Sequence, residues 1–160
     1  MRIKEINLKL SYIFLFLILI LAILPYFSFL KSGTVPSGAA LVPPSKEHWF
    51  GTDDLGIDIF SEICYGAKST IILSCSSALF AAVGGSIIGM VAGYFGGIFD
   101  EILLGIIDFF ISVPDLLLMV VLGTFLGPSL KNIIFSIVLV SWIMPAKITR
   151  SQNYGKNNIF

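Results

Sequence analysis

The chain has 160 residues, of which 56% are hydrophobic and 12% are charged. Soluble domains have about 25% charged residues, so this composition, with a mean hydropathy of +0.95, predicts a membrane protein in contact with lipid. The ten basic and ten acidic residues balance, so no basic surface for nucleic acid is expected. A soluble helical bundle would need polar faces along its helices, whereas residues 69–97 have no charged side chain.

Residues 1–9 are predicted to be an N-terminal tail and residues 10–30 the first membrane-spanning helix. A helix needs about 20 residues to cross a hydrocarbon core of about 30 Å. A cleaved signal peptide also has an apolar run after a basic start, but that run is only about 7–15 residues long. The longer run therefore favours an uncleaved anchor.

Residues 31–68 are predicted to be an external loop, because serine, glycine and proline are frequent in its first half. Apolar positions near its end predict a short helix that lies along the membrane surface. The acidic residues of the loop lack the alternating spacing of a calcium-binding loop. Asp54 or Asp58 is instead expected to cap the short helix, and direct contact with a solute or ion is the second interpretation.

Residues 69–160 contain three further predicted spans, at about 69–95, 102–126 and 132–148. In the first of these, small side chains recur at every fourth position, at Ala81, Gly85, Gly89, Gly93 and Gly97. Such a stripe lets helix backbones approach closely in lipid. We expect it to pack against another helix of the bundle, and lining a solute path is the second interpretation.

The predicted span 102–126 contains two aspartates, Asp108 and Asp115. A carboxylate at membrane depth must face protein or water, pair with another group or take up a proton. Asp115 directly follows Pro114. Both a functional role and a hydrogen bond to backbone groups freed by the proline are therefore open for Asp115.

The last predicted span contains Trp142, which we interpret as an anchor at the membrane interface. With four spans, both termini lie on the same side of the membrane. Basic residues mark the cytoplasmic side, and they lie near both ends of the chain, at Arg2, Lys4, Lys9, Lys147, Arg150 and Lys156. Both termini are therefore predicted to be cytoplasmic.

The sequence does not predict an enzyme. It lacks a glycine-rich phosphate loop with a lysine and has a single histidine. The two cysteines, Cys64 and Cys75, do not have the spacing of a zinc site. We expect no catalytic residue, no cofactor and no metal site.

Ordered motifs lie within residues 46–151. The longest consists of Gly51, Thr52, Asp53, Asp54, Leu55, Gly56 and Asp58, with His48 before it and the run Tyr65 to Lys68 after it. Residues 92–97, Val113 with Pro114, and residues 126–130 follow in the same order. Together these motifs resemble one of the paired permease subunits of bacterial ABC importers for dipeptides, oligopeptides and nickel.

The resemblance implies the N-terminal part of a type I ABC importer permease fold in the bacterial plasma (inner) membrane, with residues 69–160 as an incomplete core domain. It also implies several protein partners besides lipid: a second homologous permease, two cytoplasmic ATPases and an external solute-binding protein. ATP would be hydrolysed by the ATPases. The solute, a peptide or nickel, stays open.

In the family, a cytoplasmic coupling loop with a Glu-Ala-Ala signature should begin just beyond Phe160. The resemblance therefore implies a truncated permease that does not transport alone. The alternative is a short membrane protein that binds and modulates an intact permease. An unrelated four-span channel would require the ordered matches to be accidental.

Overall fold

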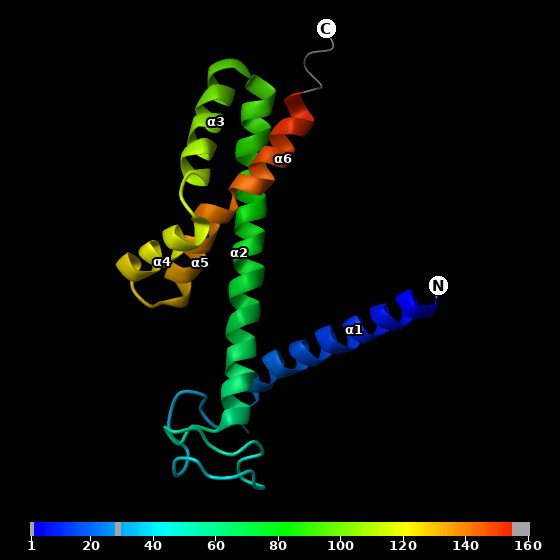
Figure 1. The fold of residues 1–160 in the computed structure, drawn as a ribbon, viewed down its shortest axis with the longest axis vertical. Helices are drawn as coiled ribbons and strands as arrows, with labels where there is room; N and C mark the ends of the chain where they lie inside the picture. The colour runs from blue at the N-terminus through cyan, green and yellow to red at the C-terminus, as the bar shows by residue number, and fades with distance from the viewer. Residues whose placement is uncertain (1, 28–29, 155–160) are drawn as a thin grey trace. The chain divides into compact units, whose positions relative to one another are not determined.

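The computed structural model describes residues 2–27 and 30–154, with side chains between residues 9 and 153 of these ranges. The described part of the chain is helical and has no strand, apart from an isolated bridge between Thr52 and Asp58. Its elements are α1 (Arg2–Ile23), η1 (Leu24–Tyr26), α2 (Ile59–Phe95), α3 (Gly97–Ile111), α4 (Asp115–Leu126), α5 (Leu130–Ser141) and α6 (Ile143–Tyr154), as Figure 1 shows. The predicted all-α class is confirmed.

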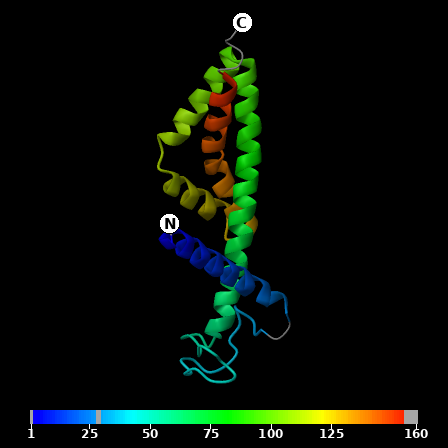
Figure 2. The same cartoon turned by 90° about the vertical axis from the view of Figure 1, so that its right-hand side faces the viewer.

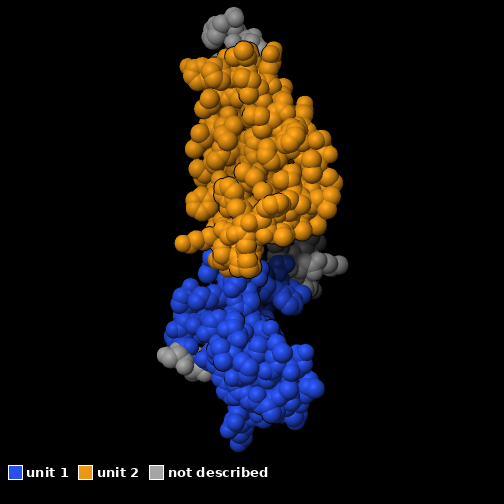
Figure 3. All heavy atoms as spheres, turned by 90° about the vertical axis from the view of Figure 1, so that its left-hand side faces the viewer, with its two compact units in different colours: residues 1–72 blue, residues 73–160 orange. Residues whose placement is uncertain are grey.

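The chain divides into two compact units, residues 1–72 and residues 73–160 (Figure 3). Three helical stretches of the described residues are long and apolar enough to cross a membrane: Lys9–Tyr26, Ile59–Phe95 and Leu130–Asn153. Helices α3 and α4 meet the same criterion together but are bent by 85°. A polytopic membrane protein is therefore confirmed, with three spans, or four if the bent pair is one span.

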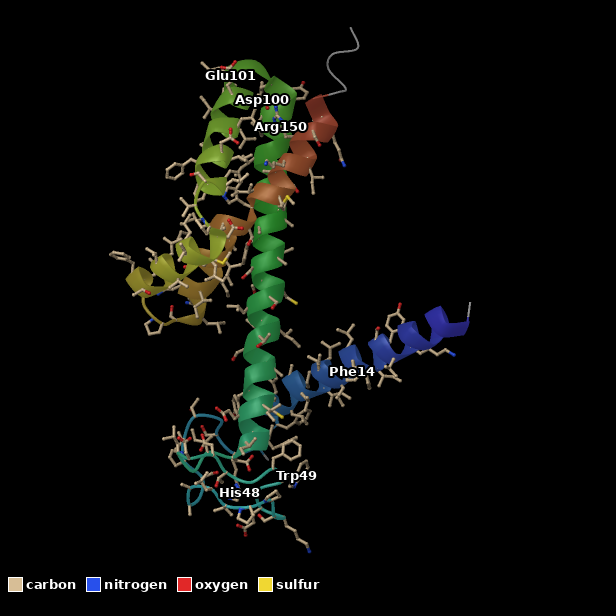
Figure 4. The ribbon with its side chains drawn as sticks, in the orientation of Figure 1. Phe14, His48, Trp49, Asp100, Glu101 and Arg150 are labelled. Atoms are coloured by element: carbon tan, nitrogen blue, oxygen red, sulfur yellow. The ribbon has the colours of Figure 1, made fainter. Side chains whose placement is uncertain are left out.

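The first predicted span is helical, but α1 ends at Ile23 and gives way to the short helix η1. Pro25 explains this end, because proline has no N–H group and disfavours helical geometry at the residue before it. The large apolar side chains between residues 10 and 20 are 40% to 67% exposed, and Phe14 is an example in Figure 4. Such a surface needs lipid or another protein around it.

The helix α2 runs without interruption from Ile59 to Phe95. The short surface helix expected at the end of the external loop is therefore the beginning of α2 and not a separate element. Gly66 lies within it, and a helix tolerates a glycine at a cost of about 1 kcal/mol relative to alanine. At about 1.5 Å per residue, its 37 residues extend over about 55 Å, which is longer than a hydrocarbon core of about 30 Å.

The predicted third span is broken between α3 and α4. Helix α3 ends at Ile111, and α4 begins at Asp115 with Pro114 in the preceding position. Proline has no N–H group to donate to a helical hydrogen bond, and its ring collides with the carbonyl group four residues earlier. The Ser112 hydroxyl donates to the carbonyl oxygen of Phe109 at 2.6 Å, which satisfies one of the groups left open at the end of α3. The sequence signalled the proline but not a bend of 85°.

A second interruption separates α5 from α6 at Trp142. Pro145 explains it, because its ring disfavours a helical carbonyl at Ser141, four residues earlier. The centroid of the Trp142 ring lies 6.3 Å from that of Phe110, and both rings pack against a buried apolar core; the interpretation of Trp142 as an interfacial anchor stays a prediction. That core consists of Ala92, Leu103, Ile107 and Ile143, so it joins α2, α3 and α6.

Helices α2 and α6 lie side by side in both Figure 1 and Figure 2. Their backbones come so close that a Cβ atom at Gly85 would lie 2.3 Å from a carbonyl oxygen of α5–α6, and one at Gly89 2.2 Å from another. A Cβ atom at Gly93 would lie 2.8 Å from a third. These distances leave no room for a larger side chain, so the three glycines set how closely the two helices pack.

The other two residues of the small-residue stripe have different positions. Ala81 is buried in α2, one turn before Gly85. Gly97 is the first residue of α3, and no atom lies within 4 Å of a Cβ built there. Gly96 and Gly97 have φ values of 61° and 52°, which glycine adopts readily. Gly97 therefore belongs to the tight turn between α2 and α3 and not to the contact with α6.

We predict that Gly89→Ala destabilises the chain by about 1–3 kcal/mol, the usual cost of overpacking a close contact. Gly84→Ala is the matched control, since nothing lies within 4 Å of a Cβ at Gly84 and alanine is the better helix former. Unfolding of both purified variants by SDS titration in mixed micelles measures the difference. Equal stability of the two variants would contradict the close contact.

Candidate functional site

The loop before α2 folds back on itself at two glycines of the motif. Gly51 and Gly56 have φ values of 78° and 77°. A Cβ atom at Gly51 would lie 2.4 Å from the carbonyl oxygen of Val42, and one at Gly56 2.4 Å from that of Gly38. Both positions therefore require glycine, for the backbone angle and for the space.

Two polar residues of the motif bind the loop backbone. The Thr52 hydroxyl donates to the carbonyl of Ala39 at 2.7 Å and accepts the N–H of Val42 at 2.9 Å. Asp53 Oδ1 accepts the N–H groups two and four positions later, at 2.9 Å and 2.7 Å. These side chains replace the missing secondary structure of the loop, so their role is to hold its shape.

A buried network connects the loop to the start of α2. Asp58 Oδ2 accepts the N–H and the hydroxyl of Ser61 at 2.9 Å and 2.7 Å, so Asp58 caps α2. Its Oδ1 lies 2.9 Å from His48 Nδ1, and His48 Nε2 lies 3.3 Å from Lys31 Nζ. An ammonium group only donates, so Nε2 accepts from Lys31 and Nδ1 donates to Asp58.

This network determines the charge of Asp58. Burial alone would raise the pKa of this carboxyl, but the hydrogen bonds from Ser61 and His48 outweigh burial and hold its pKa below the usual value. Asp58 is therefore ionised at neutral pH and acts as a fixed acceptor. No three His, Cys, Asp or Glu side chains among the described residues could hold a metal ion together.

The outward side of the loop is largely apolar. Trp49, Phe50 and Leu55 are 60%, 54% and 65% exposed, and Asp54 is exposed beside them. The rings of Trp49 and Phe50 lie 4.8 Å and 5.6 Å from that of Phe60, and Figure 4 shows Trp49 next to His48. The motif residues are thus divided between those that shape the loop and those that face away from it.

A bidentate ion pair joins α3 to α6. The Arg150 guanidinium donates through Nε to Asp100 Oδ1 and through Nη2 to Asp100 Oδ2, the second at 2.6 Å. Asp100 is buried, while the neighbouring Glu101 is exposed; Figure 4 labels all three residues. The sequence does not predict this pair, because 50 positions separate its members and no pattern connects them.

A cavity of about 590 Å³ lies at the break between α3 and α4. Its walls are formed by Ile111, Val113, Pro114, Asp115, Val140, Ser141, Ile143, Met144 and Lys147. Both aspartates are exposed, but Asp115, the first residue of α4, lines this cavity, whereas Asp108 on α3 does not. The two aspartates that looked alike in the sequence therefore have different surroundings.

Comparison with known proteins relates this chain to a family. Residues 85–153 match the family of binding-protein-dependent transport system inner membrane components. The oligopeptide transport system permease protein of Bacillus subtilis (strain 168) is 40% identical over 141 residues, which are 88% of this chain and 46% of that protein. The chain is therefore similar to part of a permease protein of a binding-protein-dependent (ABC) importer.

Two dipeptide transport system permease proteins are also similar to this chain. That of Bacillus subtilis (strain 168) is 40% identical over 111 residues, 69% of this chain and 35% of the relative. That of Haemophilus influenzae is 31% identical over 153 residues, 91% of this chain and 52% of the relative. The chain thus spans between a third and about half of the length of these relatives.

The Asp58 network generates a prediction for the loop. Asp58→Asn should destabilise the folded loop by about 1–3 kcal/mol, because an amide cannot accept from both Ser61 and His48. Asp54→Asn is the control, since Asp54 is exposed. The chain has two tryptophans, so in a Trp142→Phe background Trp49 is the only one left. Its fluorescence during urea unfolding then measures the stability of the loop.

The same network predicts how the stability of the loop depends on pH. The contribution of ionised Asp58 is complete above the carboxyl pKa of the unfolded chain and declines as the pH falls through the lower pKa of the folded protein. The parent loop should therefore lose stability below about pH 4. In Asp58→Asn, the part of this pH dependence that comes from Asp58 should be missing. An acid transition that is the same in both chains would contradict the network.

Proposed function

We propose that this chain forms part of the solute path of a bacterial ABC importer of small peptides. The observation that carries the proposal is the 40% identity to an oligopeptide transport permease protein over 88% of the chain. A single family motif would be weak support, whereas this similarity extends across most of the helices and the external loop. Nickel, the other solute considered from the sequence, is a competing outcome of the test.

The geometry supports a role in a translocation path. The membrane helices α3 and α4 are broken rather than straight, and a cavity with one acidic and one basic side chain lies at the break. Irregular backbone at membrane depth is tolerated where it lines a water-filled cavity or is covered by protein. Secondary transporters often form their solute sites from interrupted helices, and we propose a similar arrangement for this chain.

The proposal includes the partners and the orientation that the sequence implied. The permease would pair with a second homologous permease, receive solute from an external binding protein and be driven by two cytoplasmic ATPases. Both termini would be cytoplasmic. The loop before Ile59 would then face outward, which agrees with its compact, hydrogen-bonded form and its exposed Trp49 and Leu55.

Residues of this chain would divide the work of the permease. The motif from Gly51 to Asp58 would hold the external loop in shape, and Gly85, Gly89 and Gly93 would hold α2 against α6. The Asp100–Arg150 pair would fix the end of α6 against the start of α3.

The test is uptake of a radiolabelled dipeptide by cells that keep the companion permease, ATPases and binding protein but lack this chain. Fusion of the chain to the remaining part of a relative that it matches over about half its length should restore uptake. The same fusion with Gly89→Ala should restore less, because the substitution loosens the helix contact. An empty vector and Gly84→Ala are the controls. Restored nickel uptake without peptide uptake would contradict the peptide assignment. Lower uptake in cells with an intact importer would instead identify a modulator.

A further inference from the structure

The cavity at the α3–α4 break has the size of a small-molecule site. Its volume of about 590 Å³ lies within the range of roughly 300–1,000 Å³ of ligand pockets. Three of its lining side chains are polar, namely Asp115, Ser141 and Lys147, and the others are apolar. The walls come from the bent pair α3–α4 and from α5–α6 around Trp142. The site is therefore built where two helix interruptions face each other.

Opposite charges line this cavity without neutralising each other. Asp115 begins α4 and Lys147 lies in the second turn of α6. Neither side chain makes a hydrogen bond or an ion pair within the described part of the chain. Charged groups at membrane depth are expensive unless water, a partner charge or a ligand surrounds them. A solute that carries one positive and one negative group would supply a partner charge to Asp115 and to Lys147 at the same time.

We propose that this cavity binds the two charged ends of a small zwitterionic peptide, with the ammonium group at Asp115 and the carboxylate at Lys147. This inference rests on the proposed function and adds the residues and the solute chemistry. The apolar walls at Ile111, Val140 and Ile143 contact the side chains of the bound peptide. They make no hydrogen bonds that would select one side chain over another. The site therefore recognises the termini that all free dipeptides share, and tolerates different side chains.

The test uses the accessibility of a thiol introduced into the cavity wall. Ser141→Cys is combined in the full chain with Cys75→Ala, because Cys75 is exposed and Cys64 is buried. Membranes opened by freezing and thawing are treated with a charged, membrane-impermeant thiosulfonate, with and without alanyl-alanine. The chain without Ser141→Cys gives the background. Dialanine with an acetylated N-terminus and an amidated C-terminus is the neutral competitor of similar size.

We expect the reagent to modify the thiol of the Ser141→Cys chain, and free alanyl-alanine to slow the reaction about tenfold at ten times its dissociation constant. The capped peptide should not slow it. Asp115→Asn and Lys147→Gln should each abolish this protection, while Asp108→Asn and Lys131→Gln, which lie outside the cavity, should keep it.

Absence of modification would overturn the proposal, because the cavity would then be filled by protein or lipid. Equal protection by free and capped peptide would also overturn it, since the charges would play no part. The readout is independent of transport by the complete importer. Charge-dependent protection in a chain whose fusion restores no uptake would leave the cavity assignment standing and contradict the proposed function alone.

Discussion

The arrangement of residues 73–160 depends on the close approach of α2 and α6. Three glycines one turn apart leave the backbone of α2 bare toward α6, and carbonyl oxygens of α5–α6 occupy the space where side chains would be. In lipid, apolar faces gain little by meeting each other, so association relies on this kind of packing. The Asp100–Arg150 pair and the core around Ile107 then attach α3 to the same two helices.

This anchoring explains how a span bent by 85° and a second span interrupted at one residue can exist in a membrane protein. A helix interruption exposes backbone groups that lipid cannot satisfy, so it must be held against protein or open to water. Pro114 and Pro145 place interruptions in two different spans, and the packing of Phe110 on Trp142 brings the interruptions together. The cavity with Asp115 and Lys147 is the consequence. Stable packing thus supports an irregular site directly beside it, since Ile143 belongs both to the core and to the cavity wall.

Much of this could be predicted from the sequence, and the failures have physical causes. Composition and four-residue spacing predicted the helices and the small-residue stripe, because both are local properties. The continuous start of α2 was missed, since Gly66 permits a break without requiring one. The packing of Trp142 on the core and the partner of Arg150 depend on contacts between distant segments. Sequence spacing alone cannot rank such contacts.

Cross-linking of introduced thiols tests the central claim most directly. Ala78 of α2 and Ile137 of α5 line the same groove, and neither position is one of the close-packed glycines. In a Cys75→Ala background, Ala78→Cys with Ile137→Cys should be joined in native membranes by a short reagent that reacts with two thiols. Phe80→Cys with Ile137→Cys should not be joined, because Phe80 lies outside the groove. A cross-link that fails in the first pair, or that forms equally in both, would contradict the packing of α5–α6 on α2.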